Sequence, residues 1–270
     1  MNYQTLKVSL DDGIARIEFD RTDKANALSE TMWYELRAAC QWLDATPAAR
    51  VGILAGRGRH FCAGIDLEFL GTLHAKVAGL APGHQTERLH AVIVELQSCV
   101  SALEVCRKPI IAAVQGACIG GGIDLITACD LRYATVDARF CVKEIDLAVV
   151  ADVGTIQRLP RIVGEGVARE LVLTAREFSG AEAAAMKLVN QCFEDRAALG
   201  AHVQKIAQAI ASKSPLAVRG TKETLNFSRD HSVAEGLGFV AGKNAGLLLA
   251  PDVTEAVTAA SARRPATFLD

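Results

Sequence analysis

Residues 110–128 read IIAAVQGACIGGGIDLITA, and this stretch decides the fold class. Ile110–Val114 is an unbroken apolar run, which predicts a buried strand. The triplet Gly120-Gly121-Gly122 then leads into a short helix that we predict from about Gly121 to Ala128. Glycines at a helix start let backbone N–H groups point into a cleft, where they can bind an oxyanion. Close packing of the strand against the helix explains the triplet equally well.

Strands and helices alternate on both sides of this stretch. Apolar and polar residues alternate over 7–19, around an Asp-Asp-Gly turn at 11–13, and 51–55 is a short apolar run, so we predict strands in both. Ser29 can cap a helix through about Leu43, and a helical pattern runs from about Gln85 to Cys106. Further strands are predicted at 131–134 and 140–142. This alternation favours an α/β fold of stacked βαβ units, with ligands at the carboxyl ends of the strands.

Helices dominate the predicted structure after Gly154. They are expected at 155–162, 166–174, 179–187, 196–211, 215–227, 232–249 and 251–261, with one strand at 189–193. We therefore divide the chain into an α/β core that carries the ligand site, residues 1–200, and a helical C-terminal region, residues 201–270.

Composition excludes several classes of partner. The net charge is −2 and 22% of the residues are charged, with no run of five like charges. Nucleic acids and anionic membranes need a dense basic patch, so we expect neither as a partner. No apolar run reaches 18 residues, and residues 1–10 lack the pattern of a secretion or transit signal, so we expect a cytoplasmic protein.

The cysteines and glycines give no sign of a metal or a nucleotide cofactor. None of the eight cysteines forms a Cys-x-x-Cys pair, and most lie in apolar runs, so we predict buried free thiols and no metal site. Neither glycine-rich segment, 56–61 or 116–122, has the spacing of a P-loop or of a dinucleotide-binding turn. No cofactor is expected.

Carboxylates inside apolar segments are the candidate catalytic groups. Asp124 follows the glycine triplet directly, and Glu144 and Asp152 lie between apolar neighbours. Such surroundings raise the proton affinity of a carboxylate, which suits acid–base catalysis near neutral pH. Structural roles compete: Asp152 can cap a following helix, Asp124 can pair with a buried arginine, and Asp66 can cap a helix at 67–70. The residues alone indicate proton abstraction beside a carbonyl.

Four segments resemble the crotonase (enoyl-CoA hydratase/isomerase) superfamily. They are KANAL at 24–28, RHFCAGIDL at 59–67, IGGGIDL at 119–125 with CDLR at 129–132, and ARRP at 262–265. The resemblance implies a crotonase-like spiral core of stacked ββα (βαβ) units and a helical C-terminal trimerisation region. It also implies that the amides of Ile65 and Gly121 hold the thioester oxygen of an acyl-CoA substrate. The coenzyme A site that it implies comprises Lys24, Ala25, Ala27, Ala63, Gly64, Ile65, Asp66, Leu67, Gly120 and Gly121.

Two further segments are similar to Δ3,5-Δ2,4-dienoyl-CoA isomerases within that superfamily. These are VKEID at 142–146 and ADVGTIQRLP at 151–160, and the second places an acid at Asp152. The resemblance implies conversion of 3,5-dienoyl-CoA to 2,4-dienoyl-CoA, with Asp152 taking a proton from C2 and Glu144 giving one to C6. Asp124 would orient the pair. Coenzyme A would then belong to the substrate and would not be a cofactor.

Two other functions remain open at this point. The spacing of Asp124 and Glu144 is also that of a 2-enoyl-CoA hydratase or a related isomerase, although hydratases carry Glu at both positions. The third possibility is a non-catalytic acyl-CoA-binding protein. The resemblance further implies a homotrimer or homohexamer and a place in lipid metabolism, namely fatty acid β-oxidation.

Overall fold

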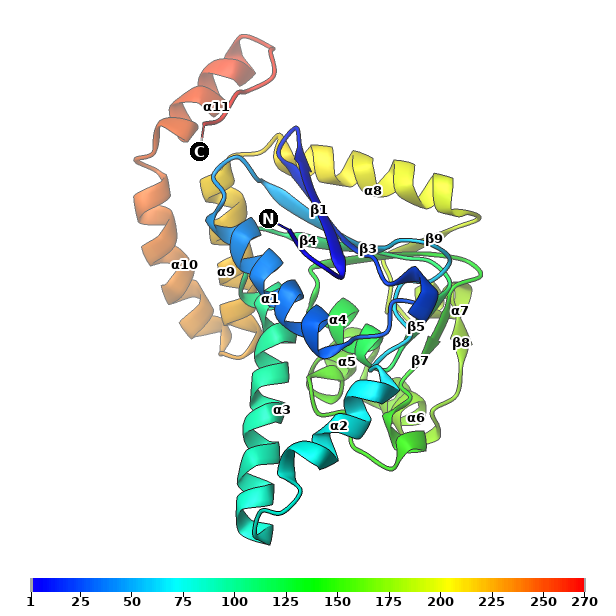
Figure 1. Ribbon diagram of the computed structural model, residues 1–270. Coiled ribbons are helices and arrows are strands. Elements are labelled where there is room, and N and C mark those ends of the chain that lie inside the picture. The colour runs from blue at the N-terminus through cyan, green and yellow to red at the C-terminus, as the bar shows by residue number, and fades with distance from the viewer. Residues whose placement is uncertain (1, 270) are drawn as a thin grey trace.

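A six-stranded sheet forms the centre of the fold (Figure 1). The structure, a computed structural model, describes residues 2–269 apart from the side chain of His74. The first two strands form an antiparallel hairpin, and every following pair in the sheet is parallel. In spatial order the strands are β1 (Leu6–Asp11), β2 (Ile14–Phe19), β3 (Val51–Gly56), β4 (Ile110–Val114), β6 (Leu131–Thr135) and β9 (Gln191–Phe193).

Helices cover both faces of this sheet. Helix α8 (Arg196–Ala211) packs Leu199, Val203 and Ala207 against one face. The opposite face packs in the larger core, whose helices include α1 (Glu30–Ala45), α3 (Pro82–Val105) and α4 (Gly121–Ala128). Alternation along β2 fits this arrangement, because Ile17 and Phe19 enter the larger core whereas Ile14 packs on the α8 side. The predicted two-sided α/β core is therefore observed.

A second, three-stranded sheet carries the glycine triplet. It consists of β5 (Ala117–Ile119), β7 (Arg139–Cys141) and β8 (Phe178–Ser179). No strand was predicted from the sequence at 117–119, because three residues are too few to show a period. β5 pairs with β7, and the Gly120 N–H donates to the Cys141 carbonyl at 2.8 Å. This pairing ends β5 where α4 begins, so the triplet lies at the junction.

Short helices surround the sheets, namely η1 (Thr22–Lys24), α2 (Leu67–Val77), η2 (Glu144–Leu147), α5 (Thr155–Val163), α6 (Glu165–Thr174) and α7 (Gly180–Ala185). The boundaries of α5, α6 and α7 lie within two residues of the predicted ones, whereas η1 and η2 were not predicted. Helix α2 is longer than the turn predicted at 67–70. Its first turn is held by Asp66, whose side chain accepts from the Glu68 N–H at 3.0 Å.

The C-terminal helices stand beside the core rather than within it (Figure 1). They are α9 (Pro215–Arg229), α10 (Val233–Leu247) and α11 (Pro251–Ser261). Lys222 anchors α9, because its ammonium group enters the core and donates to Asp130 at 2.7 Å and to the Leu103 carbonyl at 3.3 Å. The boundary predicted at residue 200 falls inside α8, which packs on the core sheet. The division into two regions stays a prediction.

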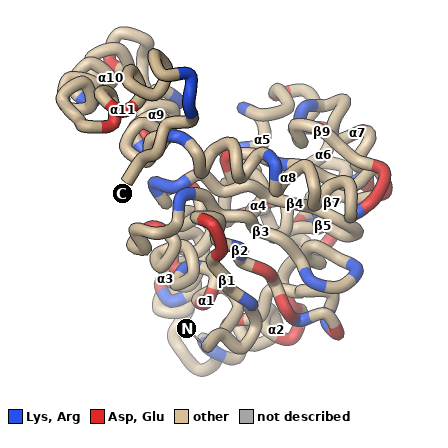
Figure 2. Tube along the Cα trace, turned by 90° about the horizontal axis from the view of Figure 1, so that it is seen from above, with Lys and Arg blue, Asp and Glu red and all other residues tan. Residues whose placement is uncertain are grey.

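Charged residues of both signs are interspersed along the chain (Figure 2). Among the described residues, no helix has the length and apolar character needed to cross a membrane. All eight cysteines are free, and all except Cys192 are buried, as the apolar runs predicted. Within residues 2–269 no three His, Cys, Asp or Glu side chains come together in a way that could bind a metal.

Candidate active site

Two free backbone amides lie side by side at the junction of β5 and α4. The segment after β3 runs along β5, since the Cys62 N–H donates to the Ala117 carbonyl at 2.9 Å and the Ile119 N–H donates back to Cys62 at 3.0 Å. A Cβ built on Gly64 would lie 3.7 Å from the Gly121 nitrogen, so no side chain separates the segments. Neither the Ile65 nor the Gly121 N–H donates a hydrogen bond to another described residue. Both are therefore available to a ligand oxygen.

The glycine triplet serves both roles that the sequence left open. Gly120 has φ +50° and ψ −116°, a conformation that residues with a Cβ avoid. A Cβ on Gly121 would lie 2.7 Å from Leu28 Cδ1, and one on Gly122 would lie 3.1 Å from the Cys62 carbonyl. Gly121 and Gly122 thus permit close packing, while Gly120 makes the turn that exposes the Gly121 amide.

Asp124 is the most deeply buried of the three candidate acids. It lies in the first turn of α4, 0% exposed, and its Oδ1 accepts from the Thr155 N–H at 2.6 Å. Its Oδ2 is buried without a hydrogen-bond partner among the described residues. Burial raises the pKa of Asp124 to about 6, despite the Thr155 contact that lowers it. The predicted alternative, an ion pair with an arginine, is not observed among the described residues; Oδ1 binds a backbone amide instead.

Glu144 reaches the glycine triplet from the start of η2. A Cβ on Gly120 would lie 3.2 Å from its Oε1, which places the carboxyl group beside the residue that precedes the Gly121 amide. Its Oε2 is buried and has no partner in the described chain. Burial raises the pKa of Glu144 to about 7, and the charges of Asp124 and Asp152 add to this effect. At neutral pH the group is therefore partly protonated.

Asp152 precedes α5 and is more accessible than the other two acids. Its side chain is exposed in the single chain, although partial burial raises its pKa. The surroundings are therefore shielded from water around Asp124 and Glu144 but not around Asp152. The predicted alternative that Asp152 caps α5 is wrong: Gly154 occupies the cap position and no side chain caps the helix. The Asp152 charge nevertheless acts on both other acids.

The predicted coenzyme A residues come together from two distant segments. The Ala63 N–H donates to the Ala25 carbonyl at 3.1 Å, and the Leu28 N–H donates to Gly64 at 2.8 Å. Two stretches of the chain therefore lie side by side, next to the glycines at 120 and 121. One stretch carries Lys24, Ala25 and Ala27, and the other carries Ala63, Gly64, Ile65, Asp66 and Leu67. The Lys24 ammonium group is exposed and pairs with Glu68 at 3.1 Å. Their role in binding stays a prediction.

Two residues that support this arrangement were not singled out from the sequence. Asn26 is fully buried with φ +57°, and its amide donates to the carbonyls of Arg57 and His60. Arg21 binds the Ala27 carbonyl at 2.5 Å and pairs with Asp66 at 2.8 Å. Asp66 is thus engaged as a helix cap and in an ion pair. The position of Asn26 between two alanines of the KANAL segment was the available signal, whereas no sequence feature marked Arg21.

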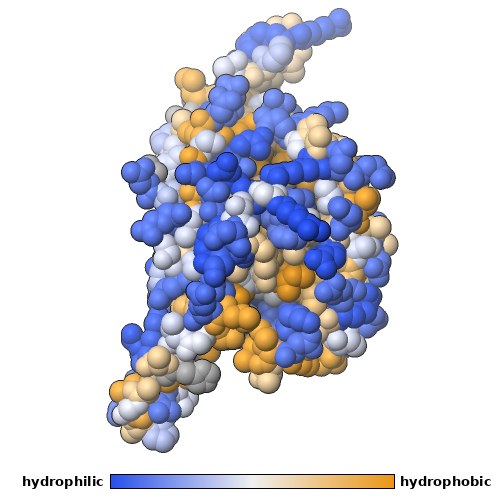
Figure 3. Space-filling model, turned by 45° about the vertical axis from the view of Figure 1, so that its right-hand side comes forward, coloured by the Kyte–Doolittle hydropathy of each residue, from blue (hydrophilic) through white to orange (hydrophobic). Residues whose placement is uncertain are grey.

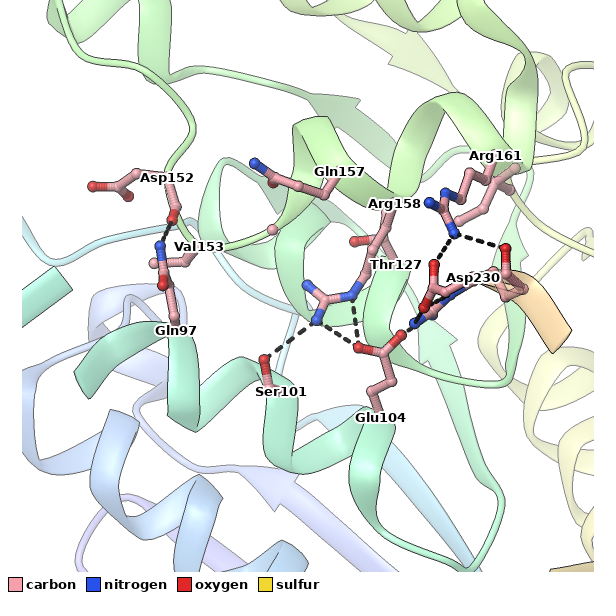
Figure 4. A pocket seen from close by; sticks show the side chains of 13 residues that line it. Gln97, Ser101, Glu104, Thr127, Asp152, Val153, Gln157, Arg158, Arg161 and Asp230 are labelled. Carbon is pink, nitrogen blue, oxygen red and sulfur yellow. Dashed lines mark hydrogen bonds and ion pairs between the residues drawn. The ribbon is translucent and has the colours of Figure 1, made fainter. Parts of the chain in front are cut away.

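A polar cavity of about 540 Å³ adjoins Asp152 (Figure 4). It is lined by α3, α5 and the end of α9, and it contains the ion pair between Arg158 and Glu104 at 2.8 Å. The carboxylate of Asp152 points away from this ion pair in Figure 4.

Apolar surface gathers in the lower half of the molecule in Figure 3. The segment between Glu144 and Asp152 is itself apolar and exposed at Val149 and Val150, the latter 68% exposed.

Comparisons with known proteins agree with this geometry. The enoyl-CoA hydratase/isomerase family model matches residues 9–242. The peroxisomal Δ(3,5)-Δ(2,4)-dienoyl-CoA isomerase of Arabidopsis thaliana is 46% identical over 271 residues, covering 99% of this chain and 98% of that protein. The mitochondrial protein of the same name from Homo sapiens is 38% identical, covering 96% of this chain and 79% of that one. Crotonyl-CoA hydratase of Syntrophomonas wolfei is 32% identical, covering 100% of this chain and 99% of that protein.

Solved structures of similar proteins share the fold. An enoyl-CoA hydratase from Bacillus anthracis superimposes with a TM-score of 0.89 at 30% identity, over 98% of this chain and 99% of that one. Another from Shewanella pealeana gives a TM-score of 0.87 at 27% identity, over 98% and 96%. The spiral α/β fold with C-terminal helices that the resemblance implied is therefore confirmed.

The expected cytoplasmic location is wrong. The relatives from Arabidopsis thaliana and Homo sapiens are named peroxisomal and mitochondrial, respectively. The expectation rested on the lack of a long apolar run and of a transit pattern in residues 1–10, and the lack of a recognised signal does not identify a compartment. The features on which the expectation rested therefore could not decide the compartment.

Proposed function

This chain belongs to the enoyl-CoA hydratase/isomerase family, and we propose that it is a dienoyl-CoA isomerase that converts 3,5-dienoyl-CoA to 2,4-dienoyl-CoA. The observation that carries the proposal is the grouping of three carboxylates, Asp124, Glu144 and Asp152, around the free amides of Ile65 and Gly121. Sequence identity of 46% to a protein named for this reaction supports the same reading.

The amides supply the electrostatic part of the proposed mechanism. Removing a proton from C2 of a thioester places negative charge on the thioester oxygen. Two N–H groups aimed at that oxygen stabilise the charge as it develops, and losing one such donor costs on the order of 10²-fold in rate. The Gly121 amide is at the start of α4, where the helix dipole adds to its effect.

The acids divide the proton transfer according to their protonation. Asp152 has the most exposed side chain of the three and is assigned the base, because water can solvate its ionised carboxylate, although partial burial raises its pKa. Glu144, with a pKa of about 7, retains a proton on part of the enzyme and is assigned the acid that protonates C6. Asp124 binds the Thr155 amide and so ties the helix of the oxyanion site to the segment that carries Asp152.

A substrate panel tests the proposal. Wild-type enzyme, Asp152→Asn and Glu144→Gln are assayed on a 3,5-dienoyl-CoA by the absorbance of the conjugated product, and on crotonyl-CoA for hydration. We expect diene isomerisation to exceed hydration, and each variant to lose 10²-fold or more of it. Asp146→Asn is the control, because Asp146 is an exposed acid of the same segment that pairs with Lys143.

The other outcomes of this panel contradict the proposal in different ways. Hydration faster than isomerisation would indicate a 2-enoyl-CoA hydratase. Binding of coenzyme A thioesters without turnover would indicate a non-catalytic protein. Full isomerisation by Asp152→Asn would remove Asp152 from the mechanism.

Self-association is the second part of the proposal. Helix α10, helix α11 and the turn between them expose large apolar side chains, among them Leu237 of α10 at 63% and Leu249 of the turn at 87%. Surfaces of this kind on protruding helices are typical of subunit contacts. We propose a homotrimer, or a hexamer of two trimers, formed through these helices, and a role in fatty acid degradation. Light scattering should give three or six times the mass of 28.7 kDa, and Leu237→Glu should lower it; a monomeric wild type refutes the assembly.

A further inference from the structure

One face of helix α3 contacts the segment that carries Asp152 (Figure 4). Gln97, Ser101 and Glu104 are four and three residues apart, so they share a face of the helix. Gln97 Nε2 donates to the main-chain carbonyl of Asp152 at 2.7 Å. One and two turns further on, Ser101 and Glu104 accept from the Arg158 guanidinium at 3.4 and 2.8 Å.

Residues 150–153 have little other support. Across the described chain, the Gln97 contact is the one hydrogen bond that these four residues make with anything outside the segment. The preceding hydrogen bond is that of the Val149 N–H with Glu144 at 3.2 Å, and the next begins at the Gly154 carbonyl. Ala151 and Val153 are buried, so apolar packing holds the segment against the core. Packing has no preferred direction, however, and the orientation of a backbone carbonyl is set by a hydrogen bond.

The end of the segment is held firmly by contrast. Gly154 has φ +132°, and a Cβ there would lie 1.8 Å from Arg158 Nη1, so the guanidinium lies directly against the turn. Arg158 is itself fixed by Glu104, and the Thr155 N–H is fixed by Asp124 at 2.6 Å. Movement of Asp152 is therefore restricted on its C-terminal side by Arg158 and Asp124. Its own peptide depends on Gln97.

We propose that Gln97 is a positioning residue that holds the Asp152 peptide, and with it the carboxylate, at the carbon from which the proton is taken. This inference rests on the proposed role of Asp152 as the base. A general base acts only within hydrogen-bond reach of its proton, and a displacement of 1 Å at a reacting group can cost on the order of 10²-fold in rate. Gln97 lies on the cavity side of this segment and, through its main-chain contact, sets where the segment is held.

The test compares Gln97→Leu with Gln157→Leu. Leucine keeps the volume and helix propensity of glutamine but cannot donate a hydrogen bond. Gln157 lines the same cavity and its side chain makes no hydrogen bond within the described residues, so it controls for the change of polarity. We expect Gln97→Leu to lower kcat for diene isomerisation by about 5- to 100-fold with KM within twofold. Gln157→Leu should stay within twofold of the wild type in both.

A double variant separates positioning from a general structural effect. If Gln97 acts through Asp152, then Gln97→Leu should cause no further loss in an Asp152→Asn background. Unfolding midpoints of all variants are measured alongside, and Gln97→Met replaces Gln97→Leu if the latter lowers the midpoint. Wild-type kcat in the Gln97 variant, or an equal loss in both backgrounds, overturns the inference. Undiminished turnover by Asp152→Asn alone would instead overturn the proposed function.

Discussion

Replacing Asp124 by asparagine is expected to remove a pH-dependent destabilisation of the fold while it impairs catalysis. The carboxyl group is fully buried, and burial raises its pKa from 3.8 to about 6. Because the folded-state pKa is raised, the folded protein binds more protons than the unfolded chain between these values, so stability falls as pH rises through them. The full difference corresponds to about 3 kcal/mol that wild-type Asp124 costs above pH 7.

The pH dependence isolates this cost from other effects of the substitution. Asparagine keeps the acceptor for the Thr155 N–H but places an amide where Oδ2 has no partner. That fixed cost, about 1–3 kcal/mol, does not titrate. The stability of Asp124→Asn relative to the wild type should therefore increase by about 2 kcal/mol between pH 4 and pH 7.5.

Urea unfolding followed by circular dichroism at a series of pH values measures the effect, at one protein concentration because the chain is proposed to associate. Asp146→Asn is the control for loss of a surface carboxylate. A relative stability that is constant from pH 4 to pH 7.5, or that decreases, would refute the reasoning. Asp124 would then be ionised without penalty, and its burial could not be what tunes the site.

Three further perturbations follow from particular contacts. The value of kcat/KM should decline above about pH 7, where Glu144 loses its proton, and at acid pH, where Asp152 gains one; a flat profile from pH 5 to 9 would contradict these roles. Gly120→Ala places a Cβ 3.2 Å from Glu144 Oε1 at φ +50°, so calorimetry should show a loss of about 1–3 kcal/mol and kcat should fall about 10²-fold. Lys222→Met leaves Asp130 with the Ile110 N–H but without its cationic partner, and should cost about 3 kcal/mol in urea unfolding; an unchanged midpoint would show that the pair does not anchor α9.

Much of the fold could be predicted from local sequence patterns. Ser29 was predicted to cap a helix, and its hydroxyl accepts from the Met32 N–H at 3.3 Å. The apolar run at 110–114 forms β4, a strand buried along its whole length, and α4 follows the triplet as expected. Signals of this kind depend only on residues that are close in the sequence, so the predictions made from them hold regardless of contacts with distant segments.

Features set by contacts between distant segments were less accessible. Strand β5 has three residues and exists because β7 pairs with it, which no local period reveals. The amides of Ile65 and Gly121 could be predicted as a pair only through the resemblance, because 56 positions of sequence separate them. A glycine in the sequence does not indicate which distant segment lies next to it. Gln97 lies on an exposed part of α3, where a glutamine is unremarkable until its contact with Asp152 is seen.

The unequal burial of the three acids is the property on which the proposed chemistry depends. A proton shuttle needs one ionised and one protonated carboxyl group at the same pH. Burial raises the pKa of all three acids, so the one whose ionised form water can still solvate is best suited to act as the base. The three side chains differ in burial: Asp124 is fully buried, Glu144 is half-buried with a pKa of about 7, and Asp152 is exposed. The accessibility of Asp152, which the sequence did not lead us to expect, is therefore what supports its proposed role as the base.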